Sequence, residues 1–222
     1  MIITIDGPTA SGKSSVSRVL ASRLGYYYLY TGLLYRAIAY LLIIHEQETI
    51  ETIAHADLEK VRALVNSERL SYRYDPQDQE QIFFDGINIT CHLKDPIVDQ
   101  AASILSTNNQ VRELLNQLQR SIAQKVHVVI DGRDAGSVVF PHAEHKFFLT
   151  ADQQERALRW YHEQRARGND ITLEQARESI AARDARDSSR DHAPLIIPEG
   201  AKTIDTSGIT IVDAVQKIVE ML

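Results

Sequence analysis

The sequence contains a single cysteine, Cys91, among its 222 residues. One thiol cannot form an intramolecular disulfide, which fits a reducing compartment. Long apolar runs are also missing, because the longest one extends only from Ala37 to Ile44 and is far too short to span a membrane. The first apolar stretch is a short strand and does not have the organisation of a secretory signal. These absences predict a soluble cytoplasmic protein.

Basic side chains are fewer than acidic ones, with 24 Lys and Arg against 30 Asp and Glu, which gives a formal net charge of −6. An acidic protein is a poor partner for nucleic acid or an anionic membrane, so we expect neither. The histidines form no H-E-x-x-H motif and no pairing with cysteine. His142 and His145 lie three positions apart in a proline-containing loop, and we interpret them as surface residues.

The sequence does contain a phosphate-binding pattern near its start. Residues 7–14 spell G-x-x-x-x-G-K-S, after the apolar run 2–5 and before an expected helix at 13–24. Glycines let backbone N–H groups approach phosphate oxygens, and the start of the helix favours the same anion. Lys13 suits the β- and γ-phosphates, and the Ser14 hydroxyl suits Mg²⁺. A chance glycine-rich turn is the alternative, but the pattern favours a bound nucleoside triphosphate.

Apolar, strand-like runs alternate with segments of helical period, which predicts an α/β fold with a parallel sheet covered by helices. The expected core strands are Ile2–Ile5, Tyr27–Tyr30, Val126–Ile130, Lys146–Leu149 and Thr203–Asp205. The expected helices are Leu33–Ile44, Val111–Ile122, Gln153–Arg167, Leu173–Ser188 and Ile211–Met221. Thr210 and Asp213 approach a capping box at the start of the last helix.

The stretch from about 68 to 90 breaks this alternation. Apolar residues alternate with polar ones, and Asp85-Gly86, a strong turn signal, separates two short apolar runs at 82–84 and 87–89. We expect a small antiparallel meander here, inserted into the parallel-sheet protein as a lobe beside the core.

Residues 156–190 include eight arginines and no lysine. Arginine holds phosphate or carboxylate through two hydrogen bonds, although a charged helical surface would explain the same composition. The apolar positions of 173–180 form one helical stripe, and further steps along it reach Arg183, Asp187 and Arg190. Charged groups on an inward face need partners, which a ligand or a structural salt-bridge cluster could supply.

Asp131 directly follows the expected strand 126–130, at the strand end where α/β proteins bind ligands. From there it could reach the Mg²⁺ shell opposite Ser14, with Arg133 and Asp134 at the mouth of the crevice. The alternative is a loop aspartate that caps a turn. Earlier in the chain, Thr31 is a candidate N-cap for the helix that follows the second strand.

Together these segments resemble the bacterial cytidylate kinases, nucleoside-monophosphate kinases that phosphorylate CMP and dCMP. The resemblance spans nearly the whole chain. It rests on I-T-I-D-G-P-x-x-x-G-K-S at 3–14, T-G-x-x-Y-R at 31–36, D-G-R-D-x-G-x-V-V-F-P at 131–141, E-R-A-x-R at 155–159 and R-D-A-R-D-S-S-R at 183–190, followed by A-P-L. The motifs at 131–141 and 183–190 are more selective than the phosphate-binding loop alone.

The resemblance implies a three-layer P-loop kinase fold in which 1–222 form a single domain. A monophosphate-binding lobe that carries the small antiparallel sheet would be inserted at about 33–110, and a mobile lid would occupy about 151–170. The reaction it implies is transfer of the γ-phosphoryl group of ATP to CMP or dCMP, giving ADP and CDP or dCDP, in pyrimidine nucleotide metabolism. ATP and the monophosphate would be the partners of a monomer, with Mg²⁺ as cofactor.

The resemblance also implies a role for each matching residue. The ATP phosphates would be held by Gly7, Pro8, Thr9, Ala10, Ser11, Gly12, Lys13, Ser14 and Ser15. Near the acceptor phosphate would lie Thr31, Arg36 and Arg133; near the cytosine, Ser103, Arg112, Asp134 and Arg190; and at the pentose, Arg183 and Asp187. Catalysis would use Lys13, Asp131 and the lid residues Arg156 and Arg159. Mg²⁺ would be bound by Ser14 directly and by Asp131 through water.

Three positions depart from the family pattern. Tyr30 stands where an aspartate is usual, Lys94 replaces a common arginine, and Trp160 occupies a position where a second lid arginine is frequent. We expect that none touches the phosphate-binding loop or the set Arg183, Asp187 and Arg190, and that activity survives. Another small-molecule P-loop kinase, acting on a different monophosphate or metabolite, remains the alternative. A regulatory GTPase would need an N-K-x-D motif, which is absent, and the acidic balance disfavours a nucleic-acid-remodelling ATPase.

Overall fold

The computed structural model describes residues 1–65, 68–77 and 79–222. These residues form two compact units, one made of Met1–Tyr26 with Val129–Leu222 and the other of Tyr27–Val128. The stretch of about 33–110 that the sequence suggests as an inserted lobe lies within the range of the second unit. Its positions 66, 67 and 78 are outside the described residues.

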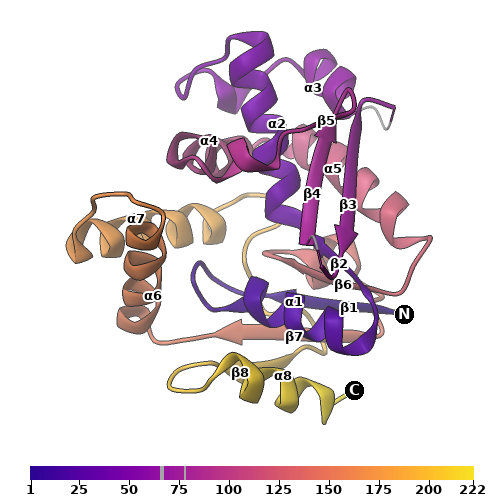
Figure 1. Cartoon of the computed structure of the whole chain (residues 1–222), viewed down its shortest axis with the longest axis vertical. Helices are drawn as coiled ribbons and strands as arrows, with labels where there is room; N and C mark the ends of the chain where they lie inside the picture. Colours follow the sequence, from indigo (N-terminus) through magenta and orange to yellow (C-terminus); the bar gives the residue numbers. More distant parts are fainter. Residues whose placement is uncertain (66–67, 78) are drawn as a thin grey trace. The chain divides into compact units, whose positions relative to one another are not determined.

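The α/β fold class is confirmed, with a parallel core sheet and a separate small antiparallel sheet. The order of the five-stranded sheet is β2-β6-β1-β7-β8. Its strands are β1 (Ile2–Asp6), β2 (Tyr27–Tyr30), β6 (Val128–Gly132), β7 (His145–Thr150) and β8 (Lys202–Asp205). Within the first unit β7 pairs in parallel with both β1 and β8 (Figure 1). All residues of β6 are buried, as expected for a parallel strand that is covered on both faces.

Three helices of the first unit each follow a strand of the core sheet: α1 (Lys13–Leu24), α6 (Gln153–Ala166) and α8 (Ile211–Val219). Helix α7 (Leu173–Ser188) follows α6, and a π-helical turn, η3, lies at Ala135–Val139. In Figure 1, α6 and α7 lie side by side. A capping box formed by Thr210 and Asp213 starts α8, which confirms that sequence pattern.

The second unit is built around the apolar helix α2 (Thr31–Glu46), which buries residues such as Leu34, Ile38 and Leu42 completely. Around it are α3 (Leu58–Val65), α4 (Pro96–Leu105) and α5 (Asn109–Ala123), with the 3₁₀ turns η1 (Ile53–His55) and η2 (Thr90–Lys94). Burial of a Leu or Ile side chain contributes about 1.5–3 kcal/mol, so this helix is a main source of the unit's stability.

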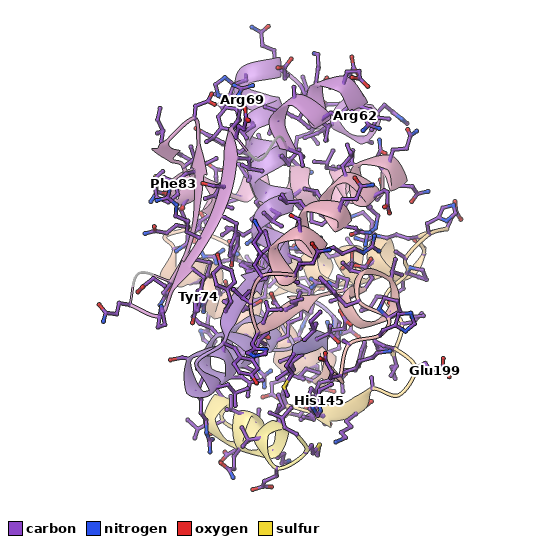
Figure 2. The ribbon with its side chains drawn as sticks, turned by 90° about the vertical axis from the view of Figure 1, so that its right-hand side faces the viewer. Arg62, Arg69, Tyr74, Phe83, His145 and Glu199 are labelled. Atoms are coloured by element: carbon purple, nitrogen blue, oxygen red, sulfur yellow. The ribbon has the colours of Figure 1, made fainter. Side chains whose placement is uncertain are left out.

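The expected antiparallel meander is present in the second unit, in the strand order β3-β4-β5. These strands are β3 (Leu70–Asp75), β4 (Gln79–Phe84) and β5 (Ile87–Asn88). Asp85 and Gly86 form the turn between β4 and β5 with φ values of 48° and 80°, as a tight hairpin with two left-handed residues requires. Figure 2 shows Tyr74 and Arg69 near opposite ends of this sheet.

The helix start expected at Thr31 is wrong by one residue. Tyr30 is the N-cap of α2, and Thr31 is already helical and buried. Helices α3 and α4 were not predicted, although Asp95 caps α4 through the N–H of Ile97 and Pro96 occupies its first position. That aspartate–proline pair is a typical helix start. Within the described residues, no helix is both long and apolar enough to cross a membrane.

Candidate active site

The phosphate-binding loop follows β1 and leads into α1 with the backbone that its glycines permit. Gly7 has a φ of 155°, and a Cβ there would lie 2.1 Å from the carbonyl oxygen of Leu149. Gly12, with a φ of 85°, caps the start of α1. Nζ of Lys13 donates to the carbonyl oxygen of Pro8 at 2.9 Å, so the lysine side chain folds back over the loop.

Lys13 is buried, with only 6% of its surface exposed. Burial lowers the pKa of Lys13 well below its usual range, and the positive charge of Arg133 lowers it further. The carboxylates of Asp131 and Asp187 act in the opposite direction but do not compensate. A bound anion would favour the charged form of Lys13, so the electrostatics of the loop suit a phosphate ligand.

Ser14 and Asp131 meet at the carboxyl ends of the core strands. Oγ of Ser14 donates to Oδ2 of Asp131 at 2.5 Å, and Asp131, at the end of β6, is buried. A hydroxyl and a carboxylate are the oxygen ligands that Mg²⁺ takes in nucleotide sites, together with substrate phosphates. Among the described residues there is no group of three or more potential His, Cys, Asp or Glu ligands. The pair therefore fits Mg²⁺ shared with a nucleotide better than an all-protein metal site.

Thr9 connects the loop to three other segments of the first unit. Its backbone N–H donates to Oδ1 of Asp184 at 3.1 Å, and its carbonyl oxygen accepts from Nη1 of Arg156 at 2.9 Å. Its hydroxyl accepts from Nη2 of Arg133 at 3.2 Å. Arg156 and Asp184 also pair directly, with Nη1 and Oδ2 2.5 Å apart. All the polar groups of Thr9 are thus bound by helices α6 and α7 and by the loop after β6.

The charged end of α7 is turned inward, as its periodicity suggests. Oδ2 of Asp187 accepts from Nε of Arg133 at 2.7 Å, and Oδ1 accepts from Nη2 of Arg190. Burial alone would raise the pKa of Asp187, but Arg133 and Arg190 outweigh it and hold the pKa below its usual value. The guanidinium of Arg183 lies 5.4 Å from the ring centroid of Trp160.

Arg159 lies one helical turn beyond Arg156 on α6. Its Nη1 donates to Oγ1 of Thr206 at 3.0 Å, its Nη2 donates to the carbonyl oxygen of the same residue at 2.7 Å, and it pairs with Glu155 at 2.8 Å. A Cβ on Gly12 would lie 3.7 Å from Nη1 of Arg159, so this guanidinium is next to the phosphate-binding loop. The structure therefore brings both expected lid arginines to the loop.

Of the other predicted residues, Asp134 is buried in the first unit, and Thr31, Arg36, Ser103 and Arg112 lie in the second. On α2, Arg36 donates to Oδ1 of Asp99 through Nε at 3.1 Å and Nη2 at 2.5 Å, and to Oη of Tyr30 through Nη1 at 2.7 Å. Burial would lower the pKa of Arg36, but Tyr30 and Asp99 together hold it above its usual value. Thr31 lies five residues before Arg36, at the start of the same helix.

Ser103 and Arg112 lie on the consecutive helices α4 and α5, and both are buried. Nη1 of Arg112 donates to the carbonyl oxygen of Ser106 at 3.1 Å, and Oγ of Ser106 donates to the carbonyl oxygen of Ser103 at 2.8 Å. The guanidinium of Arg112 also lies 5.7 Å from the ring centroid of Tyr35. The two residues are therefore linked through the turn that joins their helices.

A sequence model of the cytidylate kinases matches residues 3–222. The chain belongs to the cytidylate kinase family. The cytidylate kinase of Caldanaerobacter subterraneus subsp. tengcongensis is 40% identical over 220 residues, covering 99% of this chain and 93% of that protein. That of Streptococcus pneumoniae is 38% identical over 216 residues, covering 97% of this chain and 94% of that protein.

A solved structure with the same fold is an uncharacterized protein from Eubacterium ventriosum. The two superpose with a TM-score of 0.54 at 12% identity, covering 100% of this chain and 97% of the other. This likeness concerns the fold only. Among the positions where this cytidylate kinase family member departs from the family pattern, Lys94 is exposed at the end of η2. Trp160 packs under Arg183, so the expectation that none of these positions touches Arg183 is wrong.

Two aspartates of the first unit were not among the predicted residues. Asp184 binds Thr9 and Arg156, and no feature of the 183–190 motif alone distinguishes it from its neighbours. Asp6 is fully buried and accepts the backbone N–H groups of Ala135 at 2.8 Å and Gly136 at 2.7 Å. Burial raises the pKa of Asp6 to about 7. Its place at the end of an apolar strand, like that of Asp131, is the signal that could have found it.

Proposed function

We propose that this member of the cytidylate kinase family transfers the γ-phosphoryl group of ATP to CMP or dCMP, giving ADP and CDP or dCDP. The observation that carries the proposal is the set of bonds on Thr9, which joins the phosphate-binding loop to Arg133, Arg156 and Asp184. A donor-phosphate site bordered by fixed guanidinium groups suits transfer between two phosphorylated substrates.

The acceptor phosphate is already an anionic nucleophile, so the enzyme needs positioning and charge neutralisation more than a general base. Lys13, Arg156 and Arg159 supply the positive charge around the transferred group. Each guanidinium carries five N–H donors, so Arg156 can keep its bond to Asp184 and still donate to a phosphate oxygen. In related phosphoryl transfers one such arginine contributes about 10³–10⁵-fold to the rate.

Ser14 and Asp131 would hold Mg²⁺, Ser14 directly and Asp131 through a water molecule. When bound, the ion neutralises negative charge on the phosphates of ATP. The loop from Gly7 to Ser15 binds the phosphates through backbone N–H groups other than that of Thr9, which donates to Asp184, and the first turn of α1 adds its partial positive charge.

For the acceptor nucleotide we propose the roles that follow from the family motifs. Thr31, Arg36 and Arg133 bind its phosphate; Ser103, Arg112, Asp134 and Arg190 face the cytosine; and Arg183 and Asp187 hold the pentose. A carboxylate such as that of Asp187 is suited to accept hydrogen bonds from sugar hydroxyls. Residues of about 33–110 would form the monophosphate-binding lobe and those of about 151–170 a lid. We propose that the enzyme is a cytoplasmic monomer.

A coupled assay of ADP release across CMP, dCMP, UMP, AMP and GMP tests this function. We expect CMP or dCMP to give the highest kcat/KM, with no release of ADP when Mg²⁺ is removed by a chelator. A higher kcat/KM for a purine monophosphate, or turnover only with an unphosphorylated metabolite, would assign the chain to another reaction of small-molecule kinases.

A further inference from the structure

Tyr30 stands where cytidylate kinases usually have an aspartate, and none of the roles proposed above uses it. It ends β2 and is the N-cap of α2, but its side chain makes no capping hydrogen bond. An aspartate is among the best N-cap residues, because its carboxylate accepts N–H groups of the first turn. The first turn of α2 also lacks acidic residues. Residue 30 therefore leaves the positive end of the helix dipole without a negative charge.

The ring of Tyr30 folds back across the first turn of α2. A Cβ on Gly32 would lie 2.8 Å from Cε2 of Tyr30 and 3.3 Å from its Oη, so only glycine leaves room for this ring. On its other side the ring stacks with that of Tyr28, with an interplanar angle of 5° and 6.4 Å between centroids. These contacts fix the hydroxyl group beside Arg36, one turn further along α2.

The Tyr30 hydroxyl accepts a hydrogen bond from Nη1 of Arg36 at 2.7 Å. A phenol is both a donor and an acceptor, so accepting from Arg36 leaves its own proton for a further acceptor. Across residues 1–65, 68–77 and 79–222, no protein atom accepts that proton. The hydroxyl is therefore oriented by an arginine and remains able to donate.

Arg36, like the Tyr30 hydroxyl, can still donate hydrogen bonds to a ligand. Of its five N–H groups, two donate to Asp99 and one to Tyr30, and within the described part of the chain the other two have no protein partner. The side chains of Arg36 and Asp99 are only 12% and 14% exposed, so water reaches the remaining donors poorly. An anion with several acceptor oxygens would satisfy the donors of Arg36 and Tyr30 together.

We propose that the Tyr30 hydroxyl binds the acceptor nucleotide by donating a hydrogen bond to the phosphate group that Arg36 holds. This inference rests on the proposed function, which assigns the acceptor phosphate to Arg36. It also gives a physical reason for the departure at this position. With Asp99 already paired to Arg36, an aspartate at position 30 would put a second carboxylate on one guanidinium and repel the phosphate.

Binding of CMP and of cytidine, measured by calorimetry, separates a phosphate contact from other effects. Tyr30→Phe keeps the ring, and with it the packing on Gly32 and Tyr28, while removing the hydroxyl. We expect Tyr30→Phe to weaken CMP binding about tenfold, the effect of a hydrogen bond to a charged group, and to leave cytidine binding unchanged. Tyr74→Phe, in a ring that packs edge-on against Tyr28 in the same unit, is the matched control and should change neither.

A Tyr30→Phe variant that binds CMP at wild-type affinity would overturn the inference, and so would an equal loss of CMP and cytidine binding. Failure of the proposed function would look different, because the wild-type protein would then bind CMP no better than cytidine.

A second variant tests the argument that an aspartate at position 30 would repel the phosphate. Tyr30→Asp should weaken CMP binding more than Tyr30→Phe does. Adding Asp99→Asn to Tyr30→Asp should restore part of the lost affinity for CMP. Tyr30→Asp binding at or above wild-type affinity would refute the repulsion.

Discussion

The carboxylate of Asp184 accepts the backbone N–H of Thr9, with 3.1 Å between N and Oδ1, although 175 positions separate the two residues. Its other oxygen binds Arg156, which in turn donates to the carbonyl oxygen of Thr9. The three residues form a closed cycle of hydrogen bonds between α7, α6 and the phosphate-binding loop. Because Arg156 is buried and held on two sides, its guanidinium is positioned before any nucleotide arrives.

Asp184→Asn tests whether this cycle positions Arg156 for phosphoryl transfer. The amide oxygen can still accept from Thr9, but the charged bond to Arg156 is lost. We expect kcat to fall about tenfold, with a smaller effect on the KM for the monophosphate than on that for ATP. Steady-state kinetics with each substrate varied in turn would measure this split.

The matched control is Asp170→Asn. Asp170 also pairs with an arginine of α6, Arg165, but the two side chains are 95% and 50% exposed, against 21% and 10% for Asp184 and Arg156. Exposed ion pairs contribute about 0–1 kcal/mol, so this variant should keep wild-type kinetics. An equal fall of kcat in the two variants would show that the negative charge of this region determines kcat, and not the bonds of Asp184 to Thr9 and Arg156.

Lys13→Ala should abolish most turnover while the fold persists. We expect kcat to fall about 10²–10³-fold, because a fixed charge next to the transferred group is lost. The melting temperature should not fall, since burial already lowers the pKa of Lys13 and its charged form is disfavoured inside the protein. Single-turnover kinetics and thermal unfolding would measure both effects. Near-normal turnover would exclude the role proposed for Lys13.

Asp6 predicts a pH dependence of stability. Burial raises the pKa of Asp6 to about 7 in the folded state from its usual value of 3.8, so the folded protein binds this proton more tightly than the unfolded chain. The contribution of Asp6 is therefore fully present below about pH 4 and is lost as the pH rises to about 7. The shift corresponds to roughly a few kcal/mol.

Chemical unfolding of the wild type and of Asp6→Asn from pH 5 to pH 8 would measure this contribution. The variant cannot titrate at residue 6, so the difference in unfolding free energy between the two proteins should change steadily up to about pH 7 and level off above that pH. A constant difference would show that Asp6 has an ordinary pKa in the folded protein, held there by the N–H groups of Ala135 and Gly136.

The sequence was enough to place α1 and to predict that Asp131 lies close to Ser14, although not their direct hydrogen bond. Gly12 and Gly25 cap the two ends of α1. Ser14 and Asp131 lie near the carboxyl ends of two strands of a parallel sheet, and these ends meet at one edge. The helix follows from a local pattern of few residues, as does the hairpin turn at Asp85-Gly86. The proximity of Ser14 and Asp131 follows instead from a general rule of parallel sheets, because the two residues are 117 positions apart.

Contacts between distant segments that follow no such general rule could not be predicted from the sequence. Nothing in the sequence near Thr9 indicates that Asp184 will bind it, because the contact depends on how α7 packs within the first unit. The start of α2 was misplaced because Thr31 is the better N-cap by residue type, yet Tyr30 takes that position. Its ring packs on Gly32 and its hydroxyl binds Arg36, contacts that outweigh the cap preference.

Asp187→Ala separates a substrate-binding role of α7 from a structural one. Asp187 is buried between Arg133 and Arg190, and its removal leaves both guanidinium groups without their shared partner. If its carboxylate holds the pentose, the KM for CMP should rise at least tenfold while that for ATP changes little, since a hydrogen bond to a charged group is lost from one substrate only. A rise of similar size for both substrates would instead assign Asp187 to the support of the fold. Glu174→Gln, which breaks an exposed pair with Arg177 on the same helix, is the matched control and should leave both KM values unchanged.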